Sequence, residues 1–384
     1  LTGGRLVGSV TSFENFAECP LRYYLRYGVD LKEREEFTFS PVNFGVVLHA
    51  VIREVCDEIK KNGESYYLIS EEKRREMVKR SVAAITDIYQ NSILKDSSRN
   101  SFMIKRMEDL ADRTVWAMGE QLKCGDFVPF VFEHKFNMEV GDGDRKQLMS
   151  GTIDRVDICE NGTDVYVRII DYKTGKKDFN IVKTYYGIDI QLMVYMEAAM
   201  KLVAKMRPGK NVIPAGVFYY NISDPIVSAT TESAEEIEDK IKGELRLKGM
   251  VNSDKDIAEK MDNTEGTSLN IPVSRKADGG FDSRRSKVMN TEQFNILGRF
   301  VDVRAIDTAD RIAGGDIRRS PYKDGQFSSC DRCPYGAVCG FSVDLPGCNY
   351  RKLKKFDDEV LWNNIKEGVD ENGKKMDTGA EERD

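Results

Sequence analysis

Two apolar segments joined by a tight-turn signal constrain the fold of this chain more than any other feature of its sequence. Residues 148–158 and 164–172 are rich in β-branched and aromatic side chains, and Glu-Asn-Gly-Thr at 160–163 lies between them. Because Asn-Gly favours the turn of a two-stranded hairpin, the segments are predicted to form antiparallel strands. The first strand carries Asp154 and the second carries Asp171 near its end. The hairpin therefore brings two carboxylates to neighbouring strands.

Carboxylates in this arrangement are suited to holding a divalent cation. Hydrolysis of a phosphodiester needs a cation that neutralises developing charge and activates water, and Mg²⁺ prefers oxygen ligands. Asp154 and Asp171 are the predicted metal ligands, and the main-chain carbonyl of Tyr172 is a further candidate. Strand alternation places Lys173 on the same face as Asp171, where it can position the attacking water or stabilise charge on the phosphate. A lone Asp-x-Lys is more often a surface salt bridge, so the assignment depends on the surrounding motifs.

Segments with helical spacing flank the hairpin. A helix predicted to begin near Asn43 buries an apolar stripe, and His49 lies at the edge of that stripe. After the hairpin, residues 181–205 return to helical spacing. Gln191 and Tyr195 share one face of this second helix because they lie four residues apart.

The remaining elements follow from the same patterns. Ser12 is predicted to cap an N-terminal helix that Pro20 breaks. Residues 223–292 carry few strong patterns, and a long loop is expected between two of the helices. The predicted strands lie at 130–140 and 215–221, and the predicted helices lie within 71–122 and near 231–247 and 291–313.

The hairpin motifs resemble those of the RecB-like branch of the PD-(D/E)XK nuclease superfamily. They are Gly-x-Ile-Asp-Arg-x-Asp at 151–157 and Ile-Asp-Tyr-Lys-Thr-Gly at 170–175. The resemblance implies an α/β fold with a restriction-endonuclease-like core, in which a mixed central sheet is flanked by helices. It also implies a DNA nuclease that depends on Mg²⁺, with Mn²⁺ as the alternative metal and exonuclease activity expected.

The same resemblance gives roles to residues outside the hairpin. In this branch a Gly-x-x-x-His helix supplies a metal ligand, and Gly45 and His49 match it. A Gln-x-x-x-Tyr helix lines the site and contacts DNA, and Gln191 and Tyr195 match it. Without the resemblance, His49 and Tyr195 are better explained as core residues. Glu133, on the strand before the hairpin, is a further residue that can reach the site.

A cysteine cluster near the C-terminus predicts a second metal site. Cys330, Cys333 and Cys339 form Cys-x2-Cys-x5-Cys, and three thiolates on so short a loop are typical of zinc or iron–sulfur sites. A fourth ligand is needed. Cys348 would complete a local zinc module, and Cys19 would complete a site that joins both ends of the chain.

Cys-Pro-Leu-Arg-Tyr-Tyr at 19–24, together with the cysteine loop, resembles the iron–sulfur nuclease domain of AddB-type subunits of bacterial helicase–nucleases and the RecB-like CRISPR-associated nucleases. This implies a [4Fe–4S] cluster on Cys19, Cys330, Cys333 and Cys339. A partner motor of the AddA type is implied too, because the sequence has no Gly-x4-Gly-Lys-Ser/Thr loop. The implied role is the processing of double-strand breaks for recombinational repair. A standalone CRISPR-associated nuclease and a non-catalytic DNA-binding scaffold are the alternatives.

A single nuclease domain over 1–366 is expected, with a core at 43–221, an insertion at 223–315 and a cysteine loop at 330–348. Residues 367–384 have little apolar content and are expected to be disordered. The sequence has no run of eighteen apolar residues and no secretion signal, so neither a membrane span nor export is predicted, and a bacterial cytoplasm is expected. The net charge of -6 excludes binding of DNA by overall basicity but allows a local basic groove.

Overall fold

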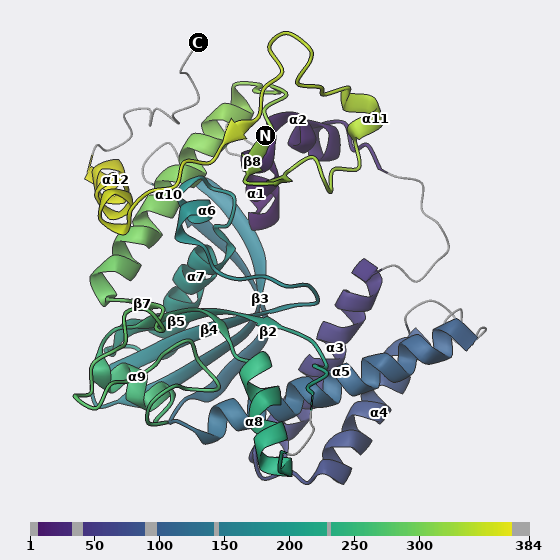
Figure 1. Cartoon of the computed structure of the whole chain (residues 1–384), viewed down its shortest axis with the longest axis vertical. Helices are drawn as coiled ribbons and strands as arrows, with labels where there is room; N and C mark the ends of the chain where they lie inside the picture. Colours follow the sequence, from purple (N-terminus) through teal and green to yellow (C-terminus); the bar gives the residue numbers. More distant parts are fainter. Residues whose placement is uncertain (1–6, 33–40, 89–97, 142–145, 229–231, 371–384) are drawn as a thin grey trace.

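A mixed β-sheet forms the centre of the fold. The computed structural model describes residues 7–32, 41–88, 98–141, 146–228 and 232–370. Within these residues the sheet has seven strands in the order β1-β3-β4-β5-β6-β7, and β2 pairs with β3 (Figure 1). The strands are β1 Val7–Ser9, β2 Val128–Val140, β3 Gln147–Asn161, β4 Asp164–Lys173, β5 Asn211–Asn221, β6 Lys248–Asn252 and β7 Val288–Met289.

The predicted hairpin is confirmed. β3 and β4 are antiparallel from Arg155 opposite Ile170 to Asn161 opposite Asp164. Gly162 lies in the turn with a φ of 60°, a left-handed conformation that glycine adopts without steric cost. Beyond the hairpin, β4 pairs with β5 in parallel, whereas β5 and β6 are antiparallel. The sheet is therefore mixed, as the family resemblance implies.

Helices cover both faces of the sheet. Successive residues of β4 belong to different hydrophobic cores, Ile169 to one and Ile170 to the other, because strand side chains alternate between faces. Figure 1 shows one group of helices on each side. The first core includes residues of α1 Val10–Glu18, α7 Gln191–Met206, α10 Thr291–Ala313 and α12 Asp358–Asp370. The second includes residues of α3 Pro41–Lys61, α4 Glu71–Ile88, α5 Ser98–Lys123 and α9 Lys255–Met261.

Shorter elements complete the chain around these layers. Most of them lie in the N-terminal and C-terminal segments, which meet at one end of the sheet in Figure 1. They are α2 Pro20–Tyr23, the π-helix η1 Tyr24–Gly28, α6 Ile181–Tyr185, α8 Ala234–Glu244, α11 Gly336–Cys339, β8 Tyr322–Asp324, β9 Phe327–Ser328 and β10 Arg351–Lys352.

Three details differ from the sequence predictions. The cap of α1 is Ser9, whose hydroxyl accepts from the Ser12 amide at 3.2 Å, so Ser12 lies inside the helix. The segment predicted as a long loop contributes β6 to the sheet, where Gly249 is required because a Cβ would lie 1.9 Å from the Val217 carbonyl oxygen. Residues 367–370 are helical rather than disordered, because α12 continues to Asp370; the rest of the predicted tail lies outside the described residues.

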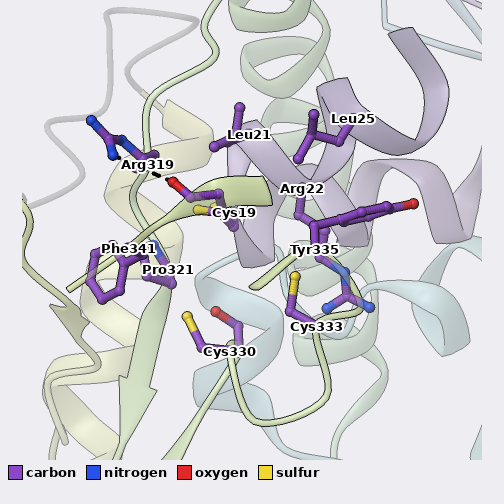
Figure 2. A pocket seen from close by; sticks show the side chains of 12 residues that line it. Cys19, Leu21, Arg22, Leu25, Arg319, Pro321, Cys330, Cys333, Tyr335 and Phe341 are labelled. Carbon is purple, nitrogen blue, oxygen red and sulfur yellow. Dashed lines mark hydrogen bonds between the residues drawn. The ribbon is translucent and has the colours of Figure 1, made fainter. Parts of the chain in front are cut away.

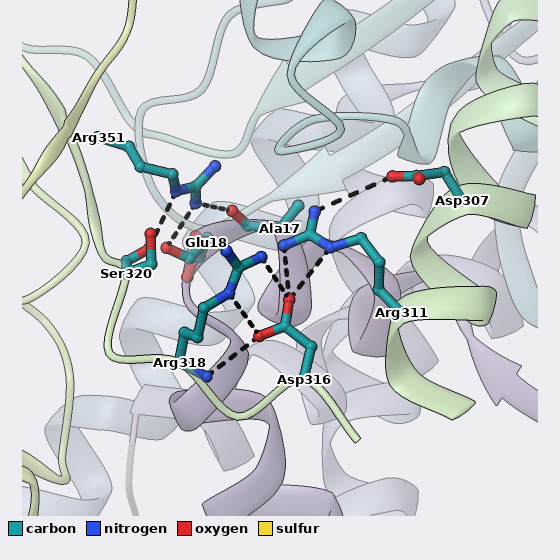
Figure 3. Close-up of polar contacts among 8 residues, drawn as sticks. All are labelled: Ala17, Glu18, Asp307, Arg311, Asp316, Arg318, Ser320 and Arg351. Atoms are coloured by element: carbon teal, nitrogen blue, oxygen red, sulfur yellow. Dashed lines mark hydrogen bonds and ion pairs between the residues drawn. The ribbon is translucent and has the colours of Figure 1, made fainter. Parts of the chain in front are cut away.

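Polar contacts join the two ends of the described chain. The Arg351 guanidinium donates to the carbonyls of Ala17 and Glu18 at the end of α1, and to the Ser320 carbonyl at 3.0 Å (Figure 3). The Leu21 amide donates to the Arg318 carbonyl at 3.2 Å. The end of α1 is thus fixed to the C-terminal segment by main-chain and side-chain hydrogen bonds.

Candidate active site

The strand register aligns three carboxylates across the sheet. Phe132 pairs with Arg155 and His134 with Ile153, which puts Glu133 of β2 opposite Asp154 of β3. On the other side, the β3–β4 register ends with Arg155 opposite Ile170, and one further step brings Asp171 opposite Asp154. Glu133, Asp154 and Asp171 therefore form a row on three adjacent strands, called the carboxylate row below.

The ladder between β3 and β4 stops where the row begins. The Tyr172 amide donates to Asp154 Oδ2 at 2.6 Å instead of to the backbone of β3. This hydrogen bond holds the Asp154 carboxylate at the end of the hairpin, where its other oxygen is 3.4 Å from His49 Nδ1. The amide of Tyr172 therefore contributes to the site directly, while metal binding by its carbonyl remains a prediction.

Glu133 is a site residue that the motifs of the sequence identify only weakly. Its φ is 47°, in the left-handed region that residues other than glycine rarely adopt, and such a conformation costs about 1–3 kcal/mol. Its Oε1 atom lies 3.6 Å from His49 Nδ1. The strained backbone thus directs the side chain toward His49, and this conformation leaves no signal in the sequence.

His49 reaches the carboxylate row from α3. One potential ligand atom from each of His49, Glu133 and Asp154 lies within 4.8 Å of the other two. Burial of the His49 ring opposes its protonation, but hydrogen bonds and charges of Asp154 and Glu133 outweigh burial and raise its pKa to about 10. The surroundings of this ring are therefore strongly anionic, and they suit a cation.

Asp171 is the most buried member of the row, with 2% of its surface exposed. Burial, together with the negative charge of Asp154, raises the pKa of Asp171 to about 7. Its Oδ2 atom is buried and forms an ion pair with the Lys173 ammonium. Two buried carboxylates that repel each other fit the ligand set of a divalent cation.

The predicted α7 residues also meet at this site. The Gln191 side chain donates to the Tyr195 hydroxyl at 2.9 Å, as their four-residue spacing predicts. Burial and the charges of Asp171 and Asp154 raise the pKa of Tyr195 above its usual value. A Cβ on Gly151 would lie 2.9 Å from Tyr195 Cε1, so glycine at this position lets α7 approach β3 closely.

Asp157, the last acid of the hairpin motif, has a different environment. Its carboxylate accepts from Arg155 at 2.7 and 2.6 Å and from Arg168 at 2.9 Å, and these three side chains are at most 1% exposed. Burial opposes ionisation of Asp157, but the two guanidinium groups outweigh it and lower the pKa of this carboxyl. Asp157 therefore stabilises the hairpin rather than contributing to the carboxylate row.

Comparison with known families agrees with this geometry. The model of the PD-(D/E)XK nuclease superfamily matches residues 8–340, a range that includes the carboxylate row, Lys173 and α7. The chain belongs to this nuclease superfamily. The fold expected for such a nuclease, a mixed central sheet flanked by helices, is the one described above.

Relatives of this nuclease include the B-type subunit of the ATP-dependent helicase/deoxyribonuclease from Lachnoclostridium phytofermentans, which is 34% identical over 393 residues, with 100% of this chain and 34% of the relative covered. A protein of the same description from Thermoanaerobacter sp. (strain X514) is 33% identical, and the match covers 96% of this chain and 33% of the relative. Another, from Clostridium acetobutylicum, is 34% identical, and the match covers 97% of this chain and 33% of the relative. The chain thus spans about a third of the length of the curated relatives it matches. In the described part of this nuclease, no helix is both long and apolar enough to span a membrane.

The four cysteines that the sequence singles out line one pocket of the nuclease. Cys19 comes from the end of α1, and Cys330 and Cys333 come from the C-terminal loop (Figure 2). Cys339, the last residue of α11, lines the same pocket. Burial raises the pKa of the Cys330 and Cys339 thiols, and neighbouring cysteines of the pocket raise it further. Cys348 is buried but is not among the residues that line this pocket. The geometry thus groups Cys19, rather than Cys348, with the cysteine loop.

Proposed function

We propose that this nuclease domain hydrolyses DNA phosphodiester bonds with a divalent metal, Mg²⁺ or Mn²⁺, held at the carboxylate row. The alignment of Glu133, Asp154 and Asp171 beside Lys173 is the observation that carries the proposal. In the proposed site, Asp154 and Asp171 would hold the metal together with His49 and the Tyr172 carbonyl, and Glu133 is a further candidate ligand. Bound there, the metal neutralises charge on the phosphate and lowers the pKa of a coordinated water.

The remaining residues act on the substrate and the water. The Lys173 ammonium now pairs with Asp171 and lies 5.6 Å from the centre of the Tyr219 ring. The proposed role of this ammonium is to position the attacking water or to stabilise charge on a phosphate oxygen. Gln191 and Tyr195, joined by their hydrogen bond, contact the DNA beside the scissile phosphate.

Cleavage assays on single-stranded and double-stranded DNA test this function. The parent chain is expected to cut DNA in the presence of Mg²⁺ or Mn²⁺ and to lose activity in a chelator. Lys173→Ala and Asp171→Asn are expected to reduce cleavage by at least a hundredfold, because positioned charge at a reacting phosphate contributes at least that much. Glu197→Ala is the matched control, since Glu197 lies on α7 but pairs with Lys201 on the surface. If Lys173→Ala cuts as fast as the parent chain, the assigned site is wrong.

We also propose that the cysteine pocket holds a [4Fe–4S] cluster. Cys19 lines this pocket together with the three cysteines of the loop, which supports the ligand set that the resemblance to iron–sulfur nuclease domains implies. Cys348, which a local zinc module would need, does not line it. Iron and sulfide analysis, with absorption near roughly 400 nm, tests this, and zinc without iron would contradict it.

The relatives support a place for this domain in a larger enzyme. Because these relatives are helicase/deoxyribonuclease subunits, we propose that the domain works with an AddA-type motor in the processing of double-strand breaks. An exonuclease is expected to release short products from a DNA end and to spare circular DNA. Cleavage of a covalently closed single-stranded circle at the same rate would instead favour an endonuclease, as in the CRISPR-associated alternative. Tight binding of DNA without cleavage in any divalent metal would favour the scaffold alternative.

A further inference from the structure

Helix α7, which carries Gln191 and Tyr195, has no cap of its own at its N-terminus. Its N-cap residue is Ile190, whose side chain makes no capping hydrogen bond. A helix start of this kind leaves main-chain N–H groups without partners, and a carboxylate is the best acceptor for them. The acceptor here is distant in the sequence: Glu14 Oε1 of α1 accepts from the Ile190 and Gln191 amides, both at 3.0 Å.

Polar and charged side chains connect Glu14 with the nuclease site. Lys177 and Asp189, whose charges act on the Glu14 carboxylate, form an ion pair with Nζ 3.1 Å from Oδ1. The Tyr219 hydroxyl donates to the same Asp189 oxygen at 2.6 Å, and the Lys177 ammonium lies 4.5 Å from the centre of the Tyr219 ring. Lys173 lies over the same ring. Glu14 is therefore part of the polar surroundings that support both α7 and Lys173.

The other end of α1 is fixed at the cysteine pocket. Cys19 is the C-cap of α1 and follows Glu14 by five residues, a distance of about 7.5 Å along a helix axis. The Glu18 carbonyl accepts from Arg351 (Figure 3). It also accepts from Ser329 Oγ at 3.3 Å. One short helix thus contacts the cysteine pocket at its end and the first turn of α7 at its middle.

We propose that Glu14 is a positioning residue through which an intact cysteine pocket orders the nuclease site. By capping α7 it fixes the direction of the first turn, and so the places of Gln191 and Tyr195 beside the carboxylate row. Loss of the group bound by the cysteines would loosen the end of α1 and withdraw the Glu14 carboxylate from the amides of Ile190 and Gln191. This inference rests on the proposed function, and it gives that function a structural requirement outside the metal ligands.

The rates of amide hydrogen exchange, measured on the 384-residue chain, test this helix cap independently of DNA cleavage. Glu14→Ala is expected to speed exchange in the first turn of α7 by roughly five- to tenfold, as the loss of a helix cap does. Glu14→Gln, which keeps an oxygen acceptor but no charge, is expected to have a smaller effect. Glu236→Ala is the matched control: Glu236 closes the capping box of α8, and exchange should change in α8 alone.

A second arm tests the connection with the cysteines. Cys330→Ser is expected to raise exchange in the first turn of α7, and addition of Glu14→Ala to that variant should raise it little further. In the cleavage assay, Glu14→Ala should lower kcat/KM by about tenfold or more while the iron content and the affinity for Mn²⁺ stay those of the parent chain. Unchanged exchange in α7 for Glu14→Ala overturns the inference, and additive effects in the double variant overturn the connection. If no variant or parent cuts DNA, the exchange results still decide the role of Glu14, whereas the proposed function fails.

Discussion

Two aspartates of the same hairpin are predicted to affect stability in opposite directions when each is replaced by the isosteric asparagine. Asp157→Asn leaves Arg155 and Arg168 buried without a counter-charge, since the carboxylate accepts from both. Removal of one partner from a buried ion pair costs about 3–5 kcal/mol. With an m-value of about 3 kcal/mol per M urea for a chain of this size, the unfolding midpoint should fall by about 1–1.7 M.

Asp171→Asn removes a carboxyl group whose ionised form destabilises the folded protein. The pKa of Asp171 is raised to about 7 from 3.8, so the folded state binds its proton more tightly than the unfolded state. The penalty is absent below about pH 4, grows as the pH rises, and reaches at most about 4 kcal/mol above pH 7. In metal-free buffer at pH 8, Asp171→Asn should therefore raise the midpoint, and near pH 4 it should match the parent chain.

The assay is urea unfolding followed by circular dichroism at pH 4.5 and pH 8, on proteins with equal iron content. Saturating Mg²⁺ at pH 8 should stabilise the parent chain more than Asp171→Asn, because the cation binds the Asp171 carboxylate that the variant lacks. An unfolding midpoint for Asp157→Asn within about 0.3 M of the parent value would refute the structural role of Asp157. A midpoint for Asp171→Asn below that of the parent chain at pH 8 would refute the assignment of Asp171 as a metal-binding acid.

Three further predictions concern Glu133, Gly151 and the cysteines. Glu133→Gln should weaken Mn²⁺ binding by about ten- to a hundredfold in titration calorimetry, and an unchanged affinity would remove Glu133 from the metal site. Gly151→Ala should slow cleavage without loss of Mn²⁺ affinity, because the new methyl group displaces the Tyr195 ring; normal cleavage would show that the close approach of α7 is dispensable. Cys19→Ser should lower the iron content after anaerobic purification while Cys348→Ser should not, and the reverse result would favour a local zinc module.

Local patterns in the sequence are sufficient to predict the hairpin and its motifs. The Asn-Gly turn, the alternation around Asp171 and the spacing of Gln191 and Tyr195 are short-range features, and the structure has each of them as expected. The convergence of Cys19 with the cysteine loop is expected from the family resemblance alone, and in the structure these cysteines line one pocket.

Features that depend on distant contacts could not be predicted in the same way. Glu133 joins the site through strand register and a left-handed backbone, and neither property follows from its neighbours in the sequence. Glu14 caps a helix that begins 177 residues later. β6 is too short to show the two-residue alternation that predicts a strand. It is a strand because it pairs with β5 around Gly249.

The carboxylate row is proposed to hold the divalent metal at which DNA is cut. Anomalous scattering from Mn²⁺ in a crystal of the parent chain tests this most directly, because it locates the ion against named side chains. We expect a peak in contact with the carboxylates of Asp154 and Asp171, within about 2.0–2.4 Å, and loss of that peak in Asp154→Asn. A Mn²⁺ ion bound elsewhere, with the row still paired only to His49 and Lys173, would contradict the proposal.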